Sequence, residues 1–373
     1  MIYLDDASTS FPKPPSVHEA MLHALRDVGA NPGRGGYASA READRLLYET
    51  RSLAADFFGA ADSSRVVFTP GCTYSLNMAL KGLLKAGDHV VVCGRQHNAV
   101  VRPLAAVGPA VSNFDWDGRG QFDAKAFSRL LRPETKAVVV NHASNVDGLL
   151  FPLDELRDAA NGVPLVIDCA QTAGVVEIRT GERDVVCAPG HKGLWGSAGV
   201  GILAFGKKIE LEPVVVGGTG SFSEDAGAPP AYPDRLEPGT MNLPGIAALG
   251  AGMREVGAVG VANVFRKKMA LALDACERLS KIRGVKIYWP ADEARRVPLF
   301  SFTVEGLDPS EAADLLDRDH GIACRSGLHC ALRAHVELGT FPVGTVRFAP
   351  GYFNVPGDVD AFAAAVGEIA KKR

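Results

Sequence analysis

Short runs of β-branched and other apolar residues recur along the first half of the chain and limit the folds it can adopt. HVVVCG at 89–94, AVVVNHAS at 137–144 and PLVIDCAQ at 164–171 are each bounded by turn or helix signals. Continuous apolar runs that alternate with helical segments are typical of a parallel sheet covered by helices on both faces. The sequence therefore predicts an α/β fold, with functional groups gathered beyond the carboxyl ends of the strands.

The length of 373 residues favours two domains. We expect a large domain at 15–260 and a smaller α/β domain at 261–373, where apolar runs such as LFSFTVEG and GTVRFAP alternate with helical segments. Residues 1–14 are expected to pack near the small domain. The stretch 217–240 is rich in glycine, proline and charge and is predicted to be a long functional loop, followed by a helical stretch over about 244–283.

Composition argues against several classes of function. The net charge of −3 gives no reason to expect nucleic acid or an anionic membrane as a partner. The longest apolar stretches fall short of the ~20 residues that span a bilayer. The acidic, proline-bearing start does not resemble a signal peptide. We therefore expect a cytoplasmic protein of ordinary globular composition, with 47% hydrophobic and 22% charged residues.

The seven cysteines predict neither a disulfide framework nor a structural zinc site, because their number is odd and the sequence has no CxxC pair. We expect no metal site. Most of the cysteines stand in apolar runs, where cysteine behaves as a small buried hydrophobe. Cys324 ends such a run and is assigned no role, whereas Cys330 stands in clearly polar surroundings.

The most informative segment is DVVCAPGHKGLWGS at 184–197, which places Lys192 in a turn of small residues. An amine in such a turn can approach a flat cofactor closely and form a Schiff base with its aldehyde. Asp168 stands 24 residues earlier, at the end of an apolar run. A carboxylate there can hold the ring nitrogen of pyridoxal 5′-phosphate (PLP) protonated. Together the two residues predict a PLP enzyme.

PGCTYSLN at 70–77 is predicted to hold the phosphate of that cofactor. A strand that ends in Gly71, Cys72 and Thr73 and opens a helix offers backbone N–H groups and a hydroxyl to an anion. The alternative is an ordinary helix start with Thr73 as the N-cap. His191, beside the lysine, is a further candidate for a phosphate contact.

Two other strand ends carry candidates. The imidazole of His97 is suited to stack on the pyridine ring and to move protons near neutral pH, and a structural hydrogen-bonding histidine is the alternative. Asn145 is a candidate donor to the cofactor O3′ or to a substrate carboxylate, with a turn asparagine before Asp147 as the alternative. His142 is expected to be structural.

Two residues nearer the C-terminus point to the substrate. Cys330 follows Arg325 in RSGLHC, and nearby positive charge makes a nucleophilic thiolate more available. A partly buried, inert cysteine is the alternative. Arg347 stands among apolar residues in GTVRFAP, and a buried arginine is rarely unpaired. Its partner is either a structural carboxylate or the α-carboxylate of a substrate, bound bidentately.

The motifs, in their order, resemble those of a known family. YLDDAST, GCT, SNVDG, DCAQ, GHKG, EPGT and RSGLHCA follow one another as in the class V, fold-type I PLP enzymes, and among them the cysteine desulfurase and selenocysteine lyase family. The RxGxxC arrangement at 325–330 resembles the desulfurases rather than their aminotransferase relatives. The resemblance implies a large domain with a mainly parallel seven-stranded sheet, PLP as cofactor, and a small domain that carries the cysteine loop.

The resemblance implies that most candidates hold the cofactor. Lys192 would form the Schiff base and move the substrate Cα proton, Asp168 would pair with the ring nitrogen, and Gln171 would bond O3′. The other contacts, to the ring face and the phosphate, would come from Cys72, Thr73, His97, Asn145 and His191.

The substrate would be L-cysteine or L-selenocysteine. Arg347 and Asn145 would bind its carboxylate, and Cys330 would accept the sulfur as a persulfide, leaving L-alanine. Thr240 resembles a residue that reaches the phosphate from a neighbouring subunit, which implies a homodimer with a shared active site. A protein that accepts the sulfur is a further implied partner.

Two departures from the resemblance stand out. Pro189 replaces a serine that often contacts the phosphate, and Asp6 replaces a common asparagine.

Two other functions stay open: another class V reaction, such as transamination or β-elimination without a persulfide, and a non-catalytic sulfur-relay partner with the same fold.

Overall fold

The computed structural model describes residues 1–33, 35–116, 121–221 and 224–371. Within these ranges seven strands pair in the order β2-β8-β7-β6-β5-β3-β4. β8 is antiparallel to both of its neighbours, and the other adjacent pairs are parallel. The α/β fold with a mainly parallel sheet is thereby confirmed. The strands are β2 (Val66–Thr69), β3 (His89–Cys93), β4 (Ala110–Phe114), β5 (Thr135–Asn141), β6 (Leu165–Asp168), β7 (Asp184–Pro189) and β8 (Gly201–Phe205).

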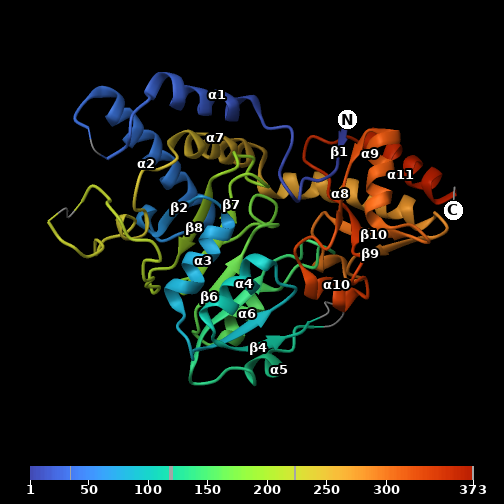
Figure 1. Cartoon of the computed structure of the whole chain (residues 1–373), viewed down its shortest axis with the longest axis horizontal. Helices are drawn as coiled ribbons and strands as arrows, with labels where there is room; N and C mark the ends of the chain where they lie inside the picture. Colours follow the sequence, from blue (N-terminus) through green and yellow to red (C-terminus); the bar gives the residue numbers. More distant parts are fainter. Residues whose placement is uncertain (34, 117–120, 222–223, 372–373) are drawn as a thin grey trace.

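Helices cover both faces of this sheet, which is why the strand sequences are apolar without alternation. α3 and α4 pack on one face, and α2, α5, α6 and α7 supply core side chains to the other. α1 lies on the outer side of α7 (Figure 1). The helices are α1 (Pro15–His23), α2 (Ala38–Phe58), α3 (Cys72–Leu83), α4 (Asn98–Val107), α5 (Ala124–Ser128), α6 (Leu153–Ala160) and α7 (Leu243–Val259).

The C-terminal part forms a second α/β unit, and both ends of the chain lie beside it (Figure 1). Its antiparallel sheet has the order β12-β13-β10-β9, and β1 (Ile2–Tyr3) pairs in parallel with β11 of this unit. The remaining elements are α8 (Val261–Ser280), β9 (Val285–Tyr288), β10 (Phe300–Val304), α9 (Pro309–His320), β11 (Ile322–Ala323), β12 (Arg325–Gly327), α10 (Leu332–Leu338), β13 (Thr345–Phe348) and α11 (Pro356–Lys371).

The helical stretch expected over about 244–283 consists of two helices. α7 ends at Gly260, whose φ of +85° breaks the helix, and α8 continues at an angle of 79°. Among the described residues no single helix has the length and hydropathy of a membrane span. Only α7 and α8 taken together, as a bent pair, reach that length and hydropathy within this part of the chain. The domain boundaries at 15–260 and 261–373 stay a prediction.

The stretch 217–240, of which residues 222–223 lie outside the described residues, is anchored at its C-terminal end. Arg51 and Glu237 form a buried bidentate ion pair with two N–O distances of 2.7 Å, and the Phe68 amide donates to the same carboxylate at 2.6 Å. These contacts hold the EPGT segment against the start of the sheet.

Candidate active site

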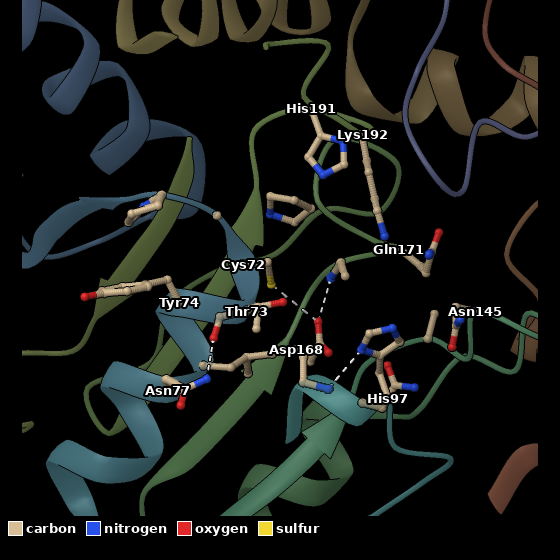
Figure 2. Close-up of a pocket in the computed structure, with 18 residues that line it drawn as sticks. Cys72, Thr73, Tyr74, Asn77, His97, Asn145, Asp168, Gln171, His191 and Lys192 are labelled. Carbon is tan, nitrogen blue, oxygen red and sulfur yellow. Dashed lines mark hydrogen bonds between the residues drawn. The ribbon is translucent and has the colours of Figure 1, made fainter. Parts of the chain in front are cut away.

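A cavity of about 410 Å³ opens at the carboxyl ends of β2, β3, β5, β6 and β7. Its volume lies within the range of ordinary small-molecule sites. The structure brings eight of the predicted site residues together in its lining, although their roles stay predictions (Figure 2). They are Cys72, Thr73, His97, Asn145, Asp168, Gln171, His191 and Lys192.

Lys192 extends from the turn after β7 into the cavity, and its amine points towards Gln171 (Figure 2). Burial lowers the pKa of the Lys192 ammonium, and the charge of Arg347 lowers it further. A lowered pKa raises the share of uncharged, nucleophilic amine at neutral pH. The arrangement therefore suits a lysine that reacts with a carbonyl group.

Asp168, the last residue of β6, faces the same cavity and is only 2% exposed. Its Oδ1 accepts from the Ala170 amide at 2.9 Å and from the Cys72 thiol at 3.8 Å. Burial raises the pKa of the Cys72 thiol well above its ordinary value, so this thiol stays protonated and can donate. The carboxylate is thus held in one orientation, as a partner for a protonated ring nitrogen requires.

The first turn of α3 lines the cavity. The helix begins at Cys72, and Gly71, with a φ of +155°, occupies the cap position without a side-chain cap. The alternative of Thr73 as the N-cap is therefore wrong, since Thr73 lies inside the first turn. The first amides of a helix have no intrahelical partner, so those of Cys72 and Thr73 can bind an anion.

His97 makes the structural hydrogen bond of its alternative role, and its stacking on a cofactor ring stays a prediction. Its Nδ1 accepts from the Ala99 amide at 3.0 Å and caps α4, so the proton of the neutral ring lies on Nε2. Burial lowers the pKa of His97, against the opposite effect of the Asp168 carboxylate. The structural alternative is present in the cap, and the neutral ring also lines the cavity.

Cys330 lies beside the part of the cavity lining formed by His97, although Cys330 itself does not line the cavity. Its carbonyl oxygen accepts from the Asn98 amide at 2.8 Å, which places it next to His97. The thiol is exposed, and Arg325 Nη2 donates to its Sγ across 3.8 Å. His329 and Cys330 have φ values of +47° and +57°. For a residue other than glycine, this left-handed backbone conformation costs about 1–3 kcal/mol, and such residues cluster at functional sites.

Arg347 is 1% exposed and does not line the cavity. Its Nη2 donates to Asp5 at 2.7 Å and to Ser8 Oγ at 2.9 Å, and its Nη1 donates to the Asn145 carbonyl at 2.9 Å. The structural carboxylate is thus the partner observed here. Its Nε is buried without a hydrogen-bond partner among the described residues, and binding of a substrate carboxylate stays a prediction.

Asn145 ties the cysteine segment to the large sheet. Its Nδ2 donates to the carbonyl of His329 at 2.7 Å, while its buried Oδ1 has no partner within the described part of the chain. The residue is therefore more than a turn former, since it positions the backbone next to Cys330. Contacts of Asn145 with cofactor or substrate stay a prediction.

Thr240 lies outside the main cavity. It is exposed and lines a neighbouring hollow of about 250 Å³. Pro70 and Tyr74 line both spaces, so the two are adjacent. The role of Thr240 as a residue of the partner's active site stays a prediction.

Comparison with known proteins identifies the family. The aminotransferase class-V profile matches residues 2–362. The chain belongs to this family. A probable cysteine desulfurase of Methanothermobacter thermautotrophicus is 32% identical over 382 residues, which cover 99% of this chain and 94% of that protein. The predicted resemblance is thereby confirmed.

Solved structures of class-V relatives agree. The apo cysteine desulfurase of Thermococcus onnurineus NA1 has a TM-score of 0.89 and 30% identity, covering 100% of this chain and 95% of that one. A cysteine desulfurase of Escherichia coli, in an S-sulfonic acid form, has a TM-score of 0.86 and 26% identity and covers 99% and 94% of the two chains.

This class-V chain departs from the resemblance at Asp6, and the structure explains how. Asp6 and Lys268 of α8 form a buried ion pair with an N–O distance of 2.7 Å. Pro189, the second departure, ends β7 and lines the cavity, where it offers neither a hydroxyl nor an N–H group.

The variant Asp6→Asn should lose about 3 kcal/mol of unfolding free energy, because it leaves the Lys268 ammonium buried without its counter-charge. Urea denaturation measures the loss. The double variant Asp6→Asn/Lys268→Met removes the unpaired charge and should recover most of it. Equal stability of the wild type and the single variant would refute this role of the pair.

Buried histidines predict a loss of stability in acid. Burial lowers the pKa of His142 to about 3 and that of His329 to about 2. Below the unfolded pKa of about 6.5, each of these histidines binds a proton in the unfolded chain but stays neutral in the folded protein. The free energy of unfolding therefore decreases as the pH falls. Each of the two rings should lower the free energy of unfolding by about 1.4 kcal/mol per pH unit between pH 6 and 4. Denaturation at pH 7 and 5 tests this, and His142→Gln should flatten the dependence.

Five side chains before α1 that contact the site were not among the predicted site residues. Asp5 and Ser8 contact Arg347, and Thr9, Ser10 and Lys13 contact the turn before Lys192. The local signals were the polar residues of this short segment and the YLDDAST motif at 3–9, which belongs to the family resemblance.

Proposed function

We propose that this class-V family member is a PLP-dependent cysteine desulfurase, which converts L-cysteine to L-alanine and takes the sulfur onto Cys330 as a persulfide. The observation that carries the proposal is the position of Cys330. An exposed thiol with a strained backbone lies beside the His97 wall of a cavity that holds Lys192 and Asp168. The naming of the relatives as cysteine desulfurases supports the same reaction.

The residues present fit PLP. The cavity offers an amine of lowered pKa, a fixed carboxylate, and a helix N-terminus with the Thr73 hydroxyl and the His191 ring near it. Burial lowers the pKa of His191 to about 4, so this ring is neutral at neutral pH. Bound PLP would supply an aldehyde for the substrate amine and a ring that takes up an electron pair.

Each residue then has a defined task. Lys192 Nζ takes the proton from the substrate Cα and later returns one to the product. Asp168 keeps a proton on the ring nitrogen. The Cys330 thiolate attacks the substrate sulfur, so an S–S bond forms and the C–S bond breaks, with its electron pair left on the carbon fragment. Protonation of that fragment yields alanine, and the balance is cysteine plus thiol to alanine plus persulfide.

The substrate carboxylate and the sulfur acceptor belong to the same proposal. Arg347 retains an Nε donor without a partner among the described residues and lies against the Asn145 backbone, which supports carboxylate binding by these two residues. An exposed persulfide on Cys330 is open to attack by an acceptor protein.

Assembly and location are further parts of the proposal. The exposure of Thr240 beside the cavity supports a homodimer with a shared site. The cysteines are free thiols in the structure, which fits a reducing compartment such as the cytoplasm.

The test is product analysis with PLP-loaded protein. L-cysteine should yield L-alanine and, with a thiol reductant, sulfide in equal amounts. L-selenocysteine in a parallel reaction shows whether selenium is also released. Formation of a 2-oxo acid in place of alanine would favour another class V reaction. A protein that binds no PLP and turns over neither amino acid would contradict the proposal.

A further inference from the structure

The segment before α1, residues 5–13, lies beside the proposed active site and contacts Arg347, Gln171 and the turn that carries Lys192. We propose that this segment positions the site, and that Lys13 in it is a positioning residue for Lys192. The inference rests on the proposed function in one respect, since it takes Lys192 as the lysine that binds the cofactor.

The contacts converge on one carbonyl oxygen, that of His191. Four donors lie within hydrogen-bonding distance of this oxygen: Lys13 Nζ at 2.7 Å, Thr9 Oγ1 at 3.0 Å, and the Ser10 amide and hydroxyl at 3.0 and 3.2 Å, so Lys13 is the nearest of them. Lys13 Nζ also donates to Ser10 Oγ at 2.6 Å. A lysine in a connecting segment ordinarily extends into water, so its inward orientation indicates a specific contact.

This carbonyl belongs to the peptide bond that joins His191 to Lys192. Fixing its oxygen fixes the plane from which the Lys192 side chain starts. The turn around it also needs small residues, because a Cβ on Gly193 would lie 2.3 Å from the Ala173 carbonyl oxygen. The donors to the His191 carbonyl and the close approach of Gly193 to Ala173 restrict the backbone on either side of Lys192. These restraints favour the direction in which the Lys192 side chain enters the cavity.

An ammonium is a strong donor to such a carbonyl. Hydrogen bonds from charged groups are about twice as strong as neutral ones. Burial lowers the pKa of Lys13 to about 8, and the carboxylate of Asp6 counters this effect. Both forms of the amine keep at least two N–H donors, so the contact does not depend on one protonation state.

The same segment holds two further groups of the site. Asp5 and Ser8 bind the guanidinium of Arg347, and the carbonyl of Ala7 accepts from Gln171 Nε2 at 3.1 Å. The acceptor end of the Gln171 amide is thereby turned away from Ala7. Six residues of this nine-residue segment thus contact Arg347, Gln171 or the carbonyl that directly precedes Lys192.

The segment is tied to the C-terminal unit as well. Asp6 pairs with Lys268, and β1, directly before the segment, pairs with β11. Residues 5–13 therefore connect the C-terminal unit to the turn that carries Lys192.

The experiment uses the full chain and the variant Lys13→Met, which keeps the length of the side chain and removes its donors. Lys13→Arg restores a charged donor, and Lys286→Met is the matched control, since Lys286 packs over the Tyr288 ring away from the segment. Two quantities are measured: the rate at which PLP-free protein captures PLP on Lys192, and deuterium exchange of the amides at 190–193.

Lys13→Met should capture PLP about tenfold more slowly and exchange the 190–193 amides faster, as loss of a charged hydrogen bond predicts. Lys13→Arg should recover much of the capture rate and of the protection of these amides. Lys286→Met should match the wild type in both quantities. Should Lys13→Met fail to fold, Thr9→Val removes a different donor to the same carbonyl and should show a smaller change in the same direction.

Wild-type values of both quantities in Lys13→Met would overturn the inference. So would failure of Lys13→Arg to recover either quantity, or equal losses in Lys286→Met. If the wild type itself captures no PLP on Lys192, the proposed function fails, whereas the exchange at 190–193 still decides whether Lys13 holds the turn.

Discussion

The variant Lys192→Ala should lose turnover of L-cysteine by about 10³-fold or more and should no longer hold PLP covalently. The first loss follows because a positioned acid–base group alone contributes about 10²–10⁴-fold. The second follows because Lys192 is the amine that reaches into the cavity from the turn after β7 (Figure 2). Initial rates of alanine formation and the visible absorption of the bound cofactor measure the two effects.

Lys81→Ala is the matched control, since Lys81 is exposed on α3 and lies outside the cavity lining. It should keep the wild-type rate and spectrum. Borohydride reduction followed by peptide mapping should place the cofactor on Lys192 in the wild type. A label on another lysine, or full turnover in Lys192→Ala, would rule out its assigned role.

The variant Cys330→Ala should lose alanine formation from L-cysteine by about 10³-fold while it binds PLP normally. The thiol is proposed to accept the sulfur directly, and removal of a covalent nucleophile has effects of this size or larger. Steady-state kinetics with L-cysteine and the cofactor spectrum measure the two properties. Release of selenium from L-selenocysteine should survive to a larger extent, since selenium can leave without a thiol acceptor.

Cys324→Ala provides the control within the same segment. Burial raises the pKa of the Cys324 thiol, so it stays protonated and unreactive at neutral pH. This variant should therefore desulfurate L-cysteine at nearly the wild-type rate. Trapping with an alkylating reagent after one turnover should find the persulfide on Cys330. Unchanged sulfur release by Cys330→Ala would mean that the sulfur takes another route.

The sequence predicted the sheet and much of the cavity because both depend on local patterns. Apolar runs without alternation mark strands that are covered on both faces. Parallel strands place their carboxyl ends at one edge, so His97, Asp168 and Lys192, each just beyond or at the end of a strand, had to come near one another. The observed lining of the cavity contains all three.

Several features were beyond such patterns. The antiparallel direction of β8 has no signature in its own residues. Arg347 had two plausible partners in the sequence, and only the fold selected Asp5, which lies 342 positions away. That Gly71 rather than Thr73 occupies the cap position of α3 likewise depended on how the chain leaves β2.

The sequence alone determined the fold class of this chain and predicted its cofactor chemistry, since strand periodicity and the pairing of Lys192 with Asp168 are properties of short segments. The tertiary structure decided how those groups are held. Lys13 meets the His191 carbonyl across 178 positions, and Cys330 meets Asn98 across the two parts of the chain. Contacts of this kind arise only when distant segments pack, because no local propensity specifies which donor reaches which acceptor.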